Sequence, residues 1–306
     1  IGNLANANRH TRSLVVNEAD LVVVIGSRLN QQTTGGFAFP WPGQPFIQIY
    51  PDEQYIGQNL RPDLGIIADA KIALTAALKI QGPRPNESRA AWVAQHHAAQ
   101  KHYSTPPERP TRRVSMERVM ADLKAALPSD AITATDAGSF GQWPQRYLEF
   151  EHPDSYISPT LGCMGPGIPS AVAAKLAHPG RLVVAHIGDG GFLMTGQEMA
   201  TAKQFGANIV AIVYNNEGYN SIRMHQEAQY PGRQYGTALV NPDFAALGTA
   251  YGALGLKVSR DEEFLPALKK AMAADRSALI EVLTDFEYVT PSATLSQLAG
   301  KRLQGD

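Results

Sequence analysis

The feature that most constrains the fold is a regular alternation of short apolar strands and helices over the C-terminal two thirds of the chain. The strand segments carry continuous apolar runs, which is typical of a parallel sheet covered by helices on both faces. In chain order, the pattern predicts helix 115–126, strand 131–136, helices 141–148 and 165–177, strand 181–187, helix 192–205, and strands 208–214 and 254–258, then helix 261–274 and strand 278–283. Ser115 is a predicted N-cap, and Asn241 with Pro242 predicts the start of one more helix. We therefore predict an α/β domain with a doubly wound parallel sheet over residues 114–306.

A smaller α/β pattern precedes this domain. It predicts strands at 20–26, 45–50 and 64–69 and a helix over about 70–80. These segments are too few for a complete doubly wound domain, so residues 1–80 are predicted to form an incomplete, Rossmann-like α/β domain. The proline-rich segment 81–113 predicts a linker with a polar helix near 90–103.

Histidines in that polar helix raise the question of a metal site. His96, His97 and His102 are close in sequence, but neighbouring positions on a helix point in different directions. We therefore interpret them as a solvated surface.

Composition narrows the class of protein. The 306 residues include 27 Lys plus Arg and 28 Asp plus Glu, for a net charge of -1, which argues against nucleic-acid or membrane-surface partners. No apolar run approaches the ~20 residues that span a bilayer. Cys163 is the only cysteine, so an internal disulfide is excluded. We predict a cytoplasmic protein and interpret Cys163 as a small packed residue.

Glycine-rich turns stand at the ends of three predicted strands, beginning at Thr135, Ile187 and Tyr214. Asp189 and Asn216 lie in two of these turns and offer the hard oxygen ligands that Mg²⁺ prefers. The adjacent glycines, Gly188, Gly190 and Gly191, would let the backbone approach a phosphate at the start of the next helix. Two hypotheses follow from these turns. They form a magnesium and diphosphate site, or they are ordinary strand-to-helix turns.

The spacing of these residues bears on that choice. Asn216 follows Asp189 by 27 residues, with a predicted helix and strand between, so both fall at the same edge of the sheet. The stretch 188–227, which begins "GDGGF" and contains "YNNEGYN", resembles the cofactor-binding domain of the acetolactate synthase and pyruvate decarboxylase superfamily of thiamine diphosphate enzymes. Segments 160–179 and 241–252 resemble the same domain, and residues 1–80 resemble most of the family's middle domain.

The resemblance implies roles for individual residues. Asp189, the Asn216 side chain and the Gly218 carbonyl would bind Mg²⁺, and the Gly162 carbonyl would accept a hydrogen bond from the aminopyrimidine. Met164 would be the apolar wedge that bends the cofactor for catalysis. The full set implied for cofactor binding is Gly138, Ser139, Gly162, Met164, Gly188, Gly190, Gly191, Asn216, Gly218 and Tyr219. His225 is the candidate for a substrate-side acid or base, although a surface position on a helix is equally open.

The function implied is that of a thiamine diphosphate- and Mg²⁺-dependent lyase or transferase, an acetolactate synthase-like decarboxylase or carboligase acting on a 2-oxo acid. Relatives activate the cofactor with a glutamate from an N-terminal domain of the neighbouring subunit, and no segment here resembles that domain. We therefore expect a fragment that is inactive alone and a homodimer or tetramer whose active site is shared between chains.

Two other functions remain open. One is a catalytically silent module that binds thiamine diphosphate. The other is a nucleotide-binding dehydrogenase-type protein, but residues 24–30, "VIGSRLN", lack the GxGxxG pattern that it needs. FAD binding by the middle domain is an alternative that its incomplete sheet does not support.

Overall fold

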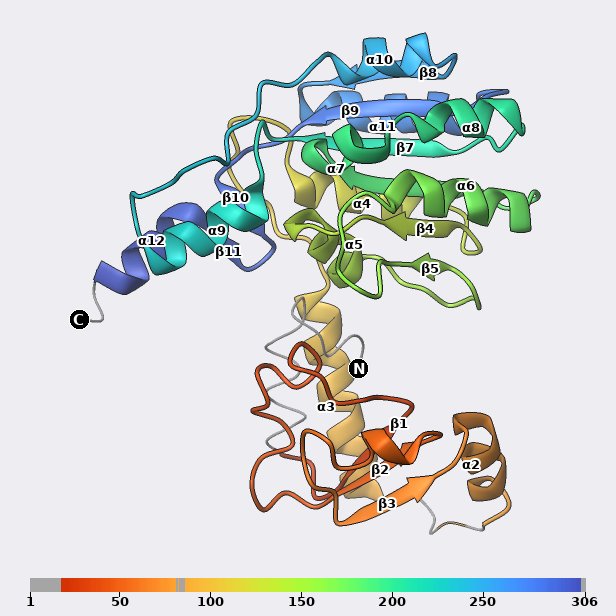
Figure 1. Cartoon of the computed structure of the whole chain (residues 1–306), viewed down its shortest axis with the longest axis vertical. Coiled ribbons are helices and arrows are strands. Elements are labelled where there is room, and N and C mark those ends of the chain that lie inside the picture. The colour runs from red at the N-terminus through yellow and green to blue at the C-terminus, as the bar shows by residue number, and fades with distance from the viewer. Residues whose placement is uncertain (1–17, 81, 83–85, 304–306) are drawn as a thin grey trace. The chain divides into compact units, whose positions relative to one another are not determined.

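The computed structural model describes residues 18–80, 82 and 86–303 of the chain (Figure 1). The chain divides into two compact units, Ile1–Thr105 and Pro106–Asp306, and the boundary falls inside the segment predicted as a linker. Both units combine parallel strands with helices, so the predicted α/β class is confirmed. Within the described ranges, no helix has the length and apolar character needed to cross a membrane.

The first unit is built on a three-stranded parallel sheet in the order β1-β2-β3. Its elements are β1 (Val22–Ile25), β2 (Phe46–Tyr50), η2 (Glu53–Tyr55), β3 (Leu64–Ile67), α2 (Ala70–Ala77) and α3 (Glu87–Tyr103). Asp69 starts α2 by accepting a hydrogen bond from the Lys71 N–H at 2.8 Å. Among the described residues of this unit, the buried core is small and consists of Val24, Leu29 and Phe46.

One histidine of α3 departs from the predicted solvated surface. His96 is completely buried, and its Nε2 lies 2.9 Å from Glu18 Oε2. Trp92, one turn earlier, packs its ring against His96 with the centroids 4.5 Å apart and donates to the same carboxylate. The interpretation was wrong for His96 because Trp92 from the same helix and Glu18 from a distant part of the chain enclose it.

The second unit contains a six-stranded sheet in the order β5-β4-β6-β7-β9-β8, with every pairing parallel. Its strands are β4 (Ile132–Thr135), β5 (Tyr156–Ile157), β6 (Val183–Gly188), β7 (Val210–Asn215), β8 (Leu254–Val258) and β9 (Ala278–Leu283), and a separate antiparallel pair consists of β10 (Tyr288–Thr290) and β11 (Ala293–Thr294). Its helices are α4 (Met116–Ala126), η3 (Ser139–Gly141), α5 (Gln142–Tyr147), α6 (Gly167–Ala177), α7 (Asp189–Thr195), α8 (Glu198–Gln204), α9 (Asn220–Gln229), α10 (Phe244–Ala250), α11 (Asp261–Met272) and α12 (Leu295–Leu303).

Two hydrophobic cores lie on the two faces of this sheet. Along β6, Val183, Ala185 and Ile187 belong to one core, whereas Val184 belongs to the other. The first core includes residues of α6, α7, α8 and α10, and the second includes residues of α4, α5 and α11. Each strand is therefore buried on both sides, which is why its sequence reads as a continuous apolar run. The predicted doubly wound sheet is confirmed.

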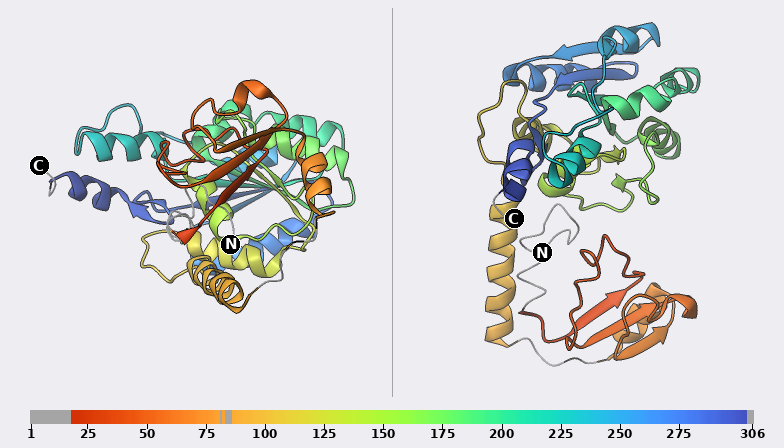
Figure 2. Two further views of the ribbon diagram at one scale, coloured as in Figure 1. Left: turned by 90° about the horizontal axis from the view of Figure 1, so that it is seen from below. Right: turned by 60° about the vertical axis from the view of Figure 1, so that its left-hand side comes forward.

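The strand order places a crevice at the edge of the sheet. After β4 the chain moves to β5 on one side and then returns to β6 on the other, so the order reverses between β4 and β6. Ligands of open α/β sheets bind at such a reversal, beyond the carboxyl ends of the strands. Beyond the same end of the sheet, α9 and α12 pack side by side and project away from it (Figures 1 and 2).

Two predicted helices differ from the structure. The predicted helix 192–205 is two helices, α7 and α8. The N-cap of α10 is Asp243, whose Oδ1 accepts from the Ala246 N–H at 2.8 Å, and not Asn241. Asn241 instead donates to Asp189 and Asn215, so a tertiary contact overrides its local preference for capping.

The two-sided core leads to a test of stability. Phe264 of α11 is completely buried, whereas Phe205 at the end of α8 is exposed. Phe264→Ala leaves a cavity and is expected to lower the free energy of unfolding by about 3–5 kcal/mol. Phe205→Ala, the matched control, is expected to change it by about 0.5 kcal/mol or less. Chemical denaturation of both variants checks this, and equal losses would contradict the assignment of Phe264 to the core.

Candidate functional site

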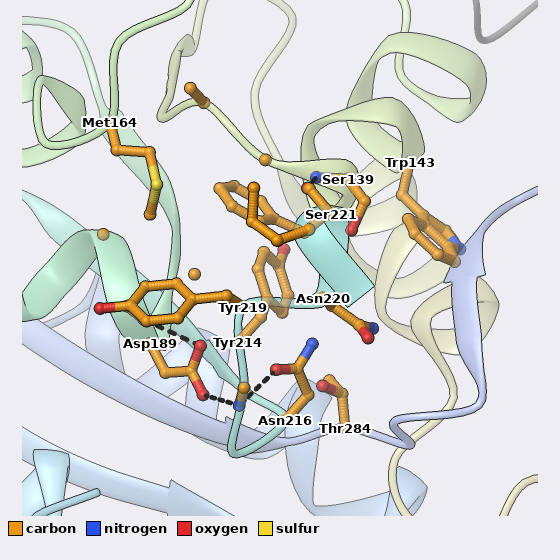
Figure 3. A pocket seen from close by; sticks show the side chains of 18 of the residues that line it. Ser139, Trp143, Met164, Asp189, Tyr214, Asn216, Tyr219, Asn220, Ser221 and Thr284 are labelled. Atoms are coloured by element: carbon orange, nitrogen blue, oxygen red, sulfur yellow. Dashed lines mark hydrogen bonds between the residues drawn. The ribbon is translucent and has the colours of Figure 1, made fainter. Parts of the chain in front are cut away.

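A cavity of about 250 Å³ lies beyond the carboxyl ends of β4, β6 and β7. It brings together the residues that the sequence predicts for the cofactor and the metal, which are Gly138, Ser139, Gly162, Met164, Gly188, Asp189, Gly190, Gly191, Asn216, Gly218 and Tyr219. The cavity is also lined by Phe140, Trp143, Tyr214, Asn220, Ser221, Ile222 and Thr284. Figure 3 shows side chains from these separate turns pointing into one space.

Asp189 is the buried acid of this cavity. It is the first residue of α7 and follows β6 directly. Its carboxylate accepts three N–H bonds, at Oδ1 from Gly190 (2.8 Å) and at Oδ2 from Asn241 (2.8 Å) and Gly218 (3.1 Å). Burial raises the pKa of Asp189 above its ordinary value, although these N–H bonds oppose the change. A nearby cation would relieve the cost of burying the charge.

Asn216 brings a second oxygen to the same point. The Gly218 N–H lies 3.1 Å from Asp189 Oδ2 and 3.1 Å from Asn216 Oδ1, so two side-chain oxygens converge on one backbone group (Figure 3). The Gly218 carbonyl accepts from the Asn220 N–H at 2.9 Å and retains a second lone pair. These groups form a hard oxygen set of the kind that Mg²⁺ binds.

The loop that carries Asn216 is held by the segment just before α10. Tyr219 donates its backbone N–H to Thr237, and Leu239 donates to Glu217, both at 2.9 Å. Glu217 adopts a left-handed conformation with φ of 60°. The resulting sharp turn points the Asn216 side chain toward Asp189. In the described ranges, no three His, Cys, Asp or Glu side chains group as metal ligands, so this oxygen set depends on an amide and a carbonyl.

Aromatic rings explain why three of the glycines are needed. A Cβ on Gly190 would lie 2.4 Å from the Tyr219 ring, and a Cβ on Gly138 or Gly188 would lie 2.3 Å or 2.9 Å from the Phe140 ring. The rings therefore rest directly on the backbone of the turns. This packing keeps the first-turn N–H groups at the cavity wall, where an anion can reach them.

Ser139 links two walls of the cavity. Its backbone N–H donates to Ser221 Oγ at 2.7 Å, and Ser221 lies in the first turn of α9. The turn after β4 is thereby tied to the amino end of a ten-residue helix. That helix end adds a positive dipole on the side where a diphosphate would lie.

Met164 and Gly162 lie on a loop that a buried aspartate holds. Asp136, next to β4, accepts from the Gly165 N–H at 2.9 Å through Oδ1 and from the Gly167 N–H at 3.4 Å through Oδ2. Gly162 has φ of +70°, a conformation that favours glycine. Met164 stays 37% exposed at the cavity mouth. Burial raises the pKa of Asp136, and the N–H bonds from Gly165, Ala137 and Gly167 oppose this.

Three side chains near the cavity were not predicted to belong to the site. Asp136 stood in the "TDAGSF" turn, where the glycine and the serine were selected instead. Asn241 Nδ2 donates to Asn215 Oδ1 at 2.8 Å and also donates to Asp189. A polar residue at the end of a buried strand was the available signal for Asp136 and Asn215, whereas the partner of Asn241 was visible only in three dimensions.

A buried His–Tyr pair underlies the cavity. His186 Nδ1 lies 2.7 Å from the hydroxyl of Tyr214, which lines the cavity. Burial lowers the pKa of His186 to about 3 and raises that of Tyr214. Both groups are therefore uncharged near neutral pH and act as a packed floor.

Two other candidates lie outside the cavity. His225 is exposed on α9 and is not among the lining residues. Its acid–base role stays a prediction. Cys163 is exposed, so its interpretation as a packed residue was wrong.

Comparison with known proteins supplies the family. Residues 136–282 match the family model described as "Thiamine pyrophosphate enzyme, C-terminal TPP binding domain", and residues 1–77 match "Thiamine pyrophosphate enzyme, central domain". The chain belongs to the thiamine pyrophosphate enzyme family. Thiamine pyrophosphate is the same cofactor as thiamine diphosphate. The matched C-terminal region contains every predicted cofactor and metal residue.

Individual relatives within the family agree with this assignment. A probable acetolactate synthase large subunit from Methanocaldococcus jannaschii is 29% identical over 88% of this chain and 47% of the relative. An acetolactate synthase large subunit from Corynebacterium glutamicum is 30% identical over 87% of this chain and 44% of the relative. A putative thiamine pyrophosphate-containing protein, YdaP, from Bacillus subtilis is 28% identical over 95% of this chain and 50% of the relative. The chain spans about half the length of these relatives.

The raised pKa of Asp189 predicts a pH dependence in the absence of metal. A carboxyl whose pKa is higher in the folded than in the unfolded chain contributes less stability as pH rises from about 4, its unfolded value, through the folded value. Asp189→Asn removes this contribution. The free energy of unfolding of the variant minus that of the wild type should therefore rise between about pH 4 and pH 7. Urea titrations at several pH values measure it, and a difference that stays constant would contradict the raised pKa.

The close approach of Tyr219 to Gly190 predicts a steric effect. Gly190→Ala pushes a methyl group into that ring and is expected to cost about 1–3 kcal/mol of unfolding free energy. Gly180→Ala is the matched control, because a Cβ there has nothing within 4 Å, and it should stabilise by up to about 1 kcal/mol. Thermal denaturation compares the two. Equal melting temperatures would show that Tyr219 moves freely.

Proposed function

We propose that this chain holds the magnesium and diphosphate end of thiamine diphosphate in an acetolactate synthase-like enzyme that acts on a 2-oxo acid. The observation that carries the proposal is the convergence of Asp189 Oδ2 and Asn216 Oδ1 on the Gly218 N–H inside the cavity. Asp189 Oδ1 and Asn216 Oδ1 each accept one N–H bond and keep a lone pair, with which they could hold a hard cation such as Mg²⁺.

The residues present fit this group. Asp189 is buried, and burial raises its pKa and disfavours the carboxylate. A bound Mg²⁺ would favour this charged carboxylate, which is the form that can act as its ligand. Asn216 and the Gly218 carbonyl complete the protein ligands. The Gly190 N–H already donates to Asp189 Oδ1, so the other first-turn N–H groups of α7, together with the amino end of α9, would hold the diphosphate.

The other wall of the cavity would orient the organic part of the cofactor. When bound, thiamine diphosphate supplies a nucleophilic carbon that adds to a 2-oxo group and accepts the electrons released as carbon dioxide leaves. Met164 offers an apolar side chain at the mouth, and the Gly162 carbonyl offers an acceptor. Asp136 keeps their loop in place through its bonds to Gly165 and Gly167.

Acid–base chemistry requires a further group. Asp189 is the only Asp, Glu, His or Lys among the described residues that line the cavity, and the proposal assigns it to the metal. We therefore propose that a second chain completes the site in a homodimer or tetramer. Exposed apolar side chains at the cavity support this, since Ile222 in the lining is 52% exposed and Leu161 beside Gly162 is 91% exposed.

The same observation supports a second candidate function. Asp189 is the only Asp, Glu, His or Lys in the described cavity lining, and as a metal ligand it could not act as an acid or base. A cavity of this kind is also expected in a module that binds thiamine diphosphate but does not convert a substrate. The two candidates differ in turnover, because only the enzyme releases carbon dioxide from a 2-oxo acid such as pyruvate.

Calorimetric titration of thiamine diphosphate tests the proposal. The wild-type chain should bind thiamine diphosphate with Mg²⁺ present and lose this binding when EDTA is added. Asp189→Ala should weaken binding by about 100-fold or more, because loss of a residue that only supports a metal ligand already costs up to about 100-fold. Asp130→Ala is the control, because this exposed aspartate lies just before β4, at the end of the sheet opposite to the cavity.

Three results would count against parts of the proposal. Equal binding with Mg²⁺ and with EDTA would contradict the metal site. Equal binding by the two aspartate variants would contradict the role of Asp189. Carbon dioxide release from pyruvate by this chain as an isolated monomer would contradict the shared site and exclude the silent module.

A further inference from the structure

We propose that Glu281 is a positioning residue for the metal ligands, acting through Asn215 and Asn241 on Asp189, and that it sets the affinity for Mg²⁺. This inference rests on the proposed function, because it concerns the same magnesium site. Glu281 lies on β9, next to β7 in the sheet, and does not line the cavity.

A chain of short hydrogen bonds connects Glu281 to Asp189. Asn215 Nδ2 donates to Glu281 Oε1 at 2.7 Å. Asn241 Nδ2 donates at 2.8 Å to Asn215 Oδ1 and at 2.8 Å to Asp189 Oδ2. Glu281 and Asp189 are almost fully buried, so water does not compete for these bonds.

The direction of each bond follows from Glu281. A carboxylate can only accept, so the Asn215 amide must present its NH₂ to Glu281 and its oxygen to Asn241. Asn241 must then present its NH₂ to Asn215, and the second hydrogen of the same NH₂ reaches Asp189. With the reverse orientation, the Asn241 oxygen would face the Asp189 carboxylate and repel it. The charge on Glu281 thereby determines that Asp189 meets a donor.

Asn215 also controls the second metal ligand. Its Oδ1 accepts from the Glu217 N–H at 3.2 Å, which fixes the turn that carries Asn216 and Gly218. The network therefore holds the carboxylate from β6 and the amide from the loop after β7 in one arrangement. Pre-ordered ligands bind a metal more tightly than ligands that must first be ordered.

A lysine anchors the outer end of the network. Lys257 Nζ lies 3.3 Å from Glu281 Oε2 and 3.2 Å from Asp243 Oδ2. Lys257 is partly exposed, and its charge balances the carboxylate that β9 buries. The inference thus predicts effects that decline from Asn241 outward to Lys257.

The experiment measures the Kd of Mg²⁺ by calorimetry for the full chain at saturating thiamine diphosphate. Glu281→Gln keeps the size of the side chain but replaces one of its two acceptor oxygens with an NH₂ donor, so Asn215 is no longer held in one orientation, and Kd is expected to rise by about 10-fold, within the range for groups that support metal ligands. Lys257→Met should raise Kd less than Glu281→Gln. The matched control is Glu227→Gln, because Glu227 is a buried carboxylate on α9 that pairs with Arg223 and does not contact Asp189. The control should leave Kd unchanged.

A double mutant separates positioning from a general loss of stability. If Glu281 acts through Asn215, Glu281→Gln should raise Kd by less than about twofold in an Asn215→Ala background, because the routes to Asp189 and to the Asn216 turn both pass through Asn215 and are already broken. A purely structural role would give the same fold-change in both backgrounds. Melting temperatures measured without metal check that each variant is folded.

The outcomes are distinct. A wild-type chain that does not bind Mg²⁺ with thiamine diphosphate would overturn the proposed function and this inference together. Wild-type binding with an unchanged Kd in a folded Glu281→Gln variant would overturn this inference alone. Additive effects of Glu281→Gln and Asn215→Ala would also overturn it.

Discussion

The site depends on one physical constraint, the burial of the Asp189 carboxylate at the carboxyl end of a central strand. A buried charge is costly unless donors or a cation face it. The structure supplies N–H groups from α7, from the loop after β7 and from the segment before α10, and the first two of these segments line the cavity. The need to satisfy one carboxylate therefore gathers the elements that would hold a cofactor.

The doubly wound sheet makes this burial possible. Helices cover both faces of β6 and β7, so the strands are buried, and the cavity lies at their carboxyl ends, where the strand order reverses. Aromatic rings form part of the cavity wall. Phe140 and Tyr219 pack directly on glycine backbone, so the glycines serve the packing of the protein as well as access for a phosphate.

Membership of the thiamine pyrophosphate enzyme family agrees with this arrangement, because the matched C-terminal domain spans all of the turns that line the cavity from Gly138 to Tyr219. The two asparagines at the end of β7 have different roles. Asn216 faces the cavity, whereas Asn215 turns inward to Glu281 and Asn241. A pair of identical residues in sequence thus has one member at the ligand and one in the support behind it.

The sequence alone determined the α/β class, the doubly wound sheet and most of the cavity wall. Continuous apolar strands predict burial on both faces, and turns at strand ends must meet at one edge of a parallel sheet, so Asp189 and Asn216 could be paired from spacing and family resemblance. Only the tertiary structure decided which partners satisfy buried groups. Asp136 holds the Met164 loop, Asn241 joins Asp189 in place of capping α10, and His96 is enclosed by Trp92 and Glu18. Local preference is worth about 1 kcal/mol for an N-cap, and the cost of leaving a buried carboxylate unsatisfied exceeds it. The contacts that prevail join residues far apart in the chain, where sequence patterns carry no signal.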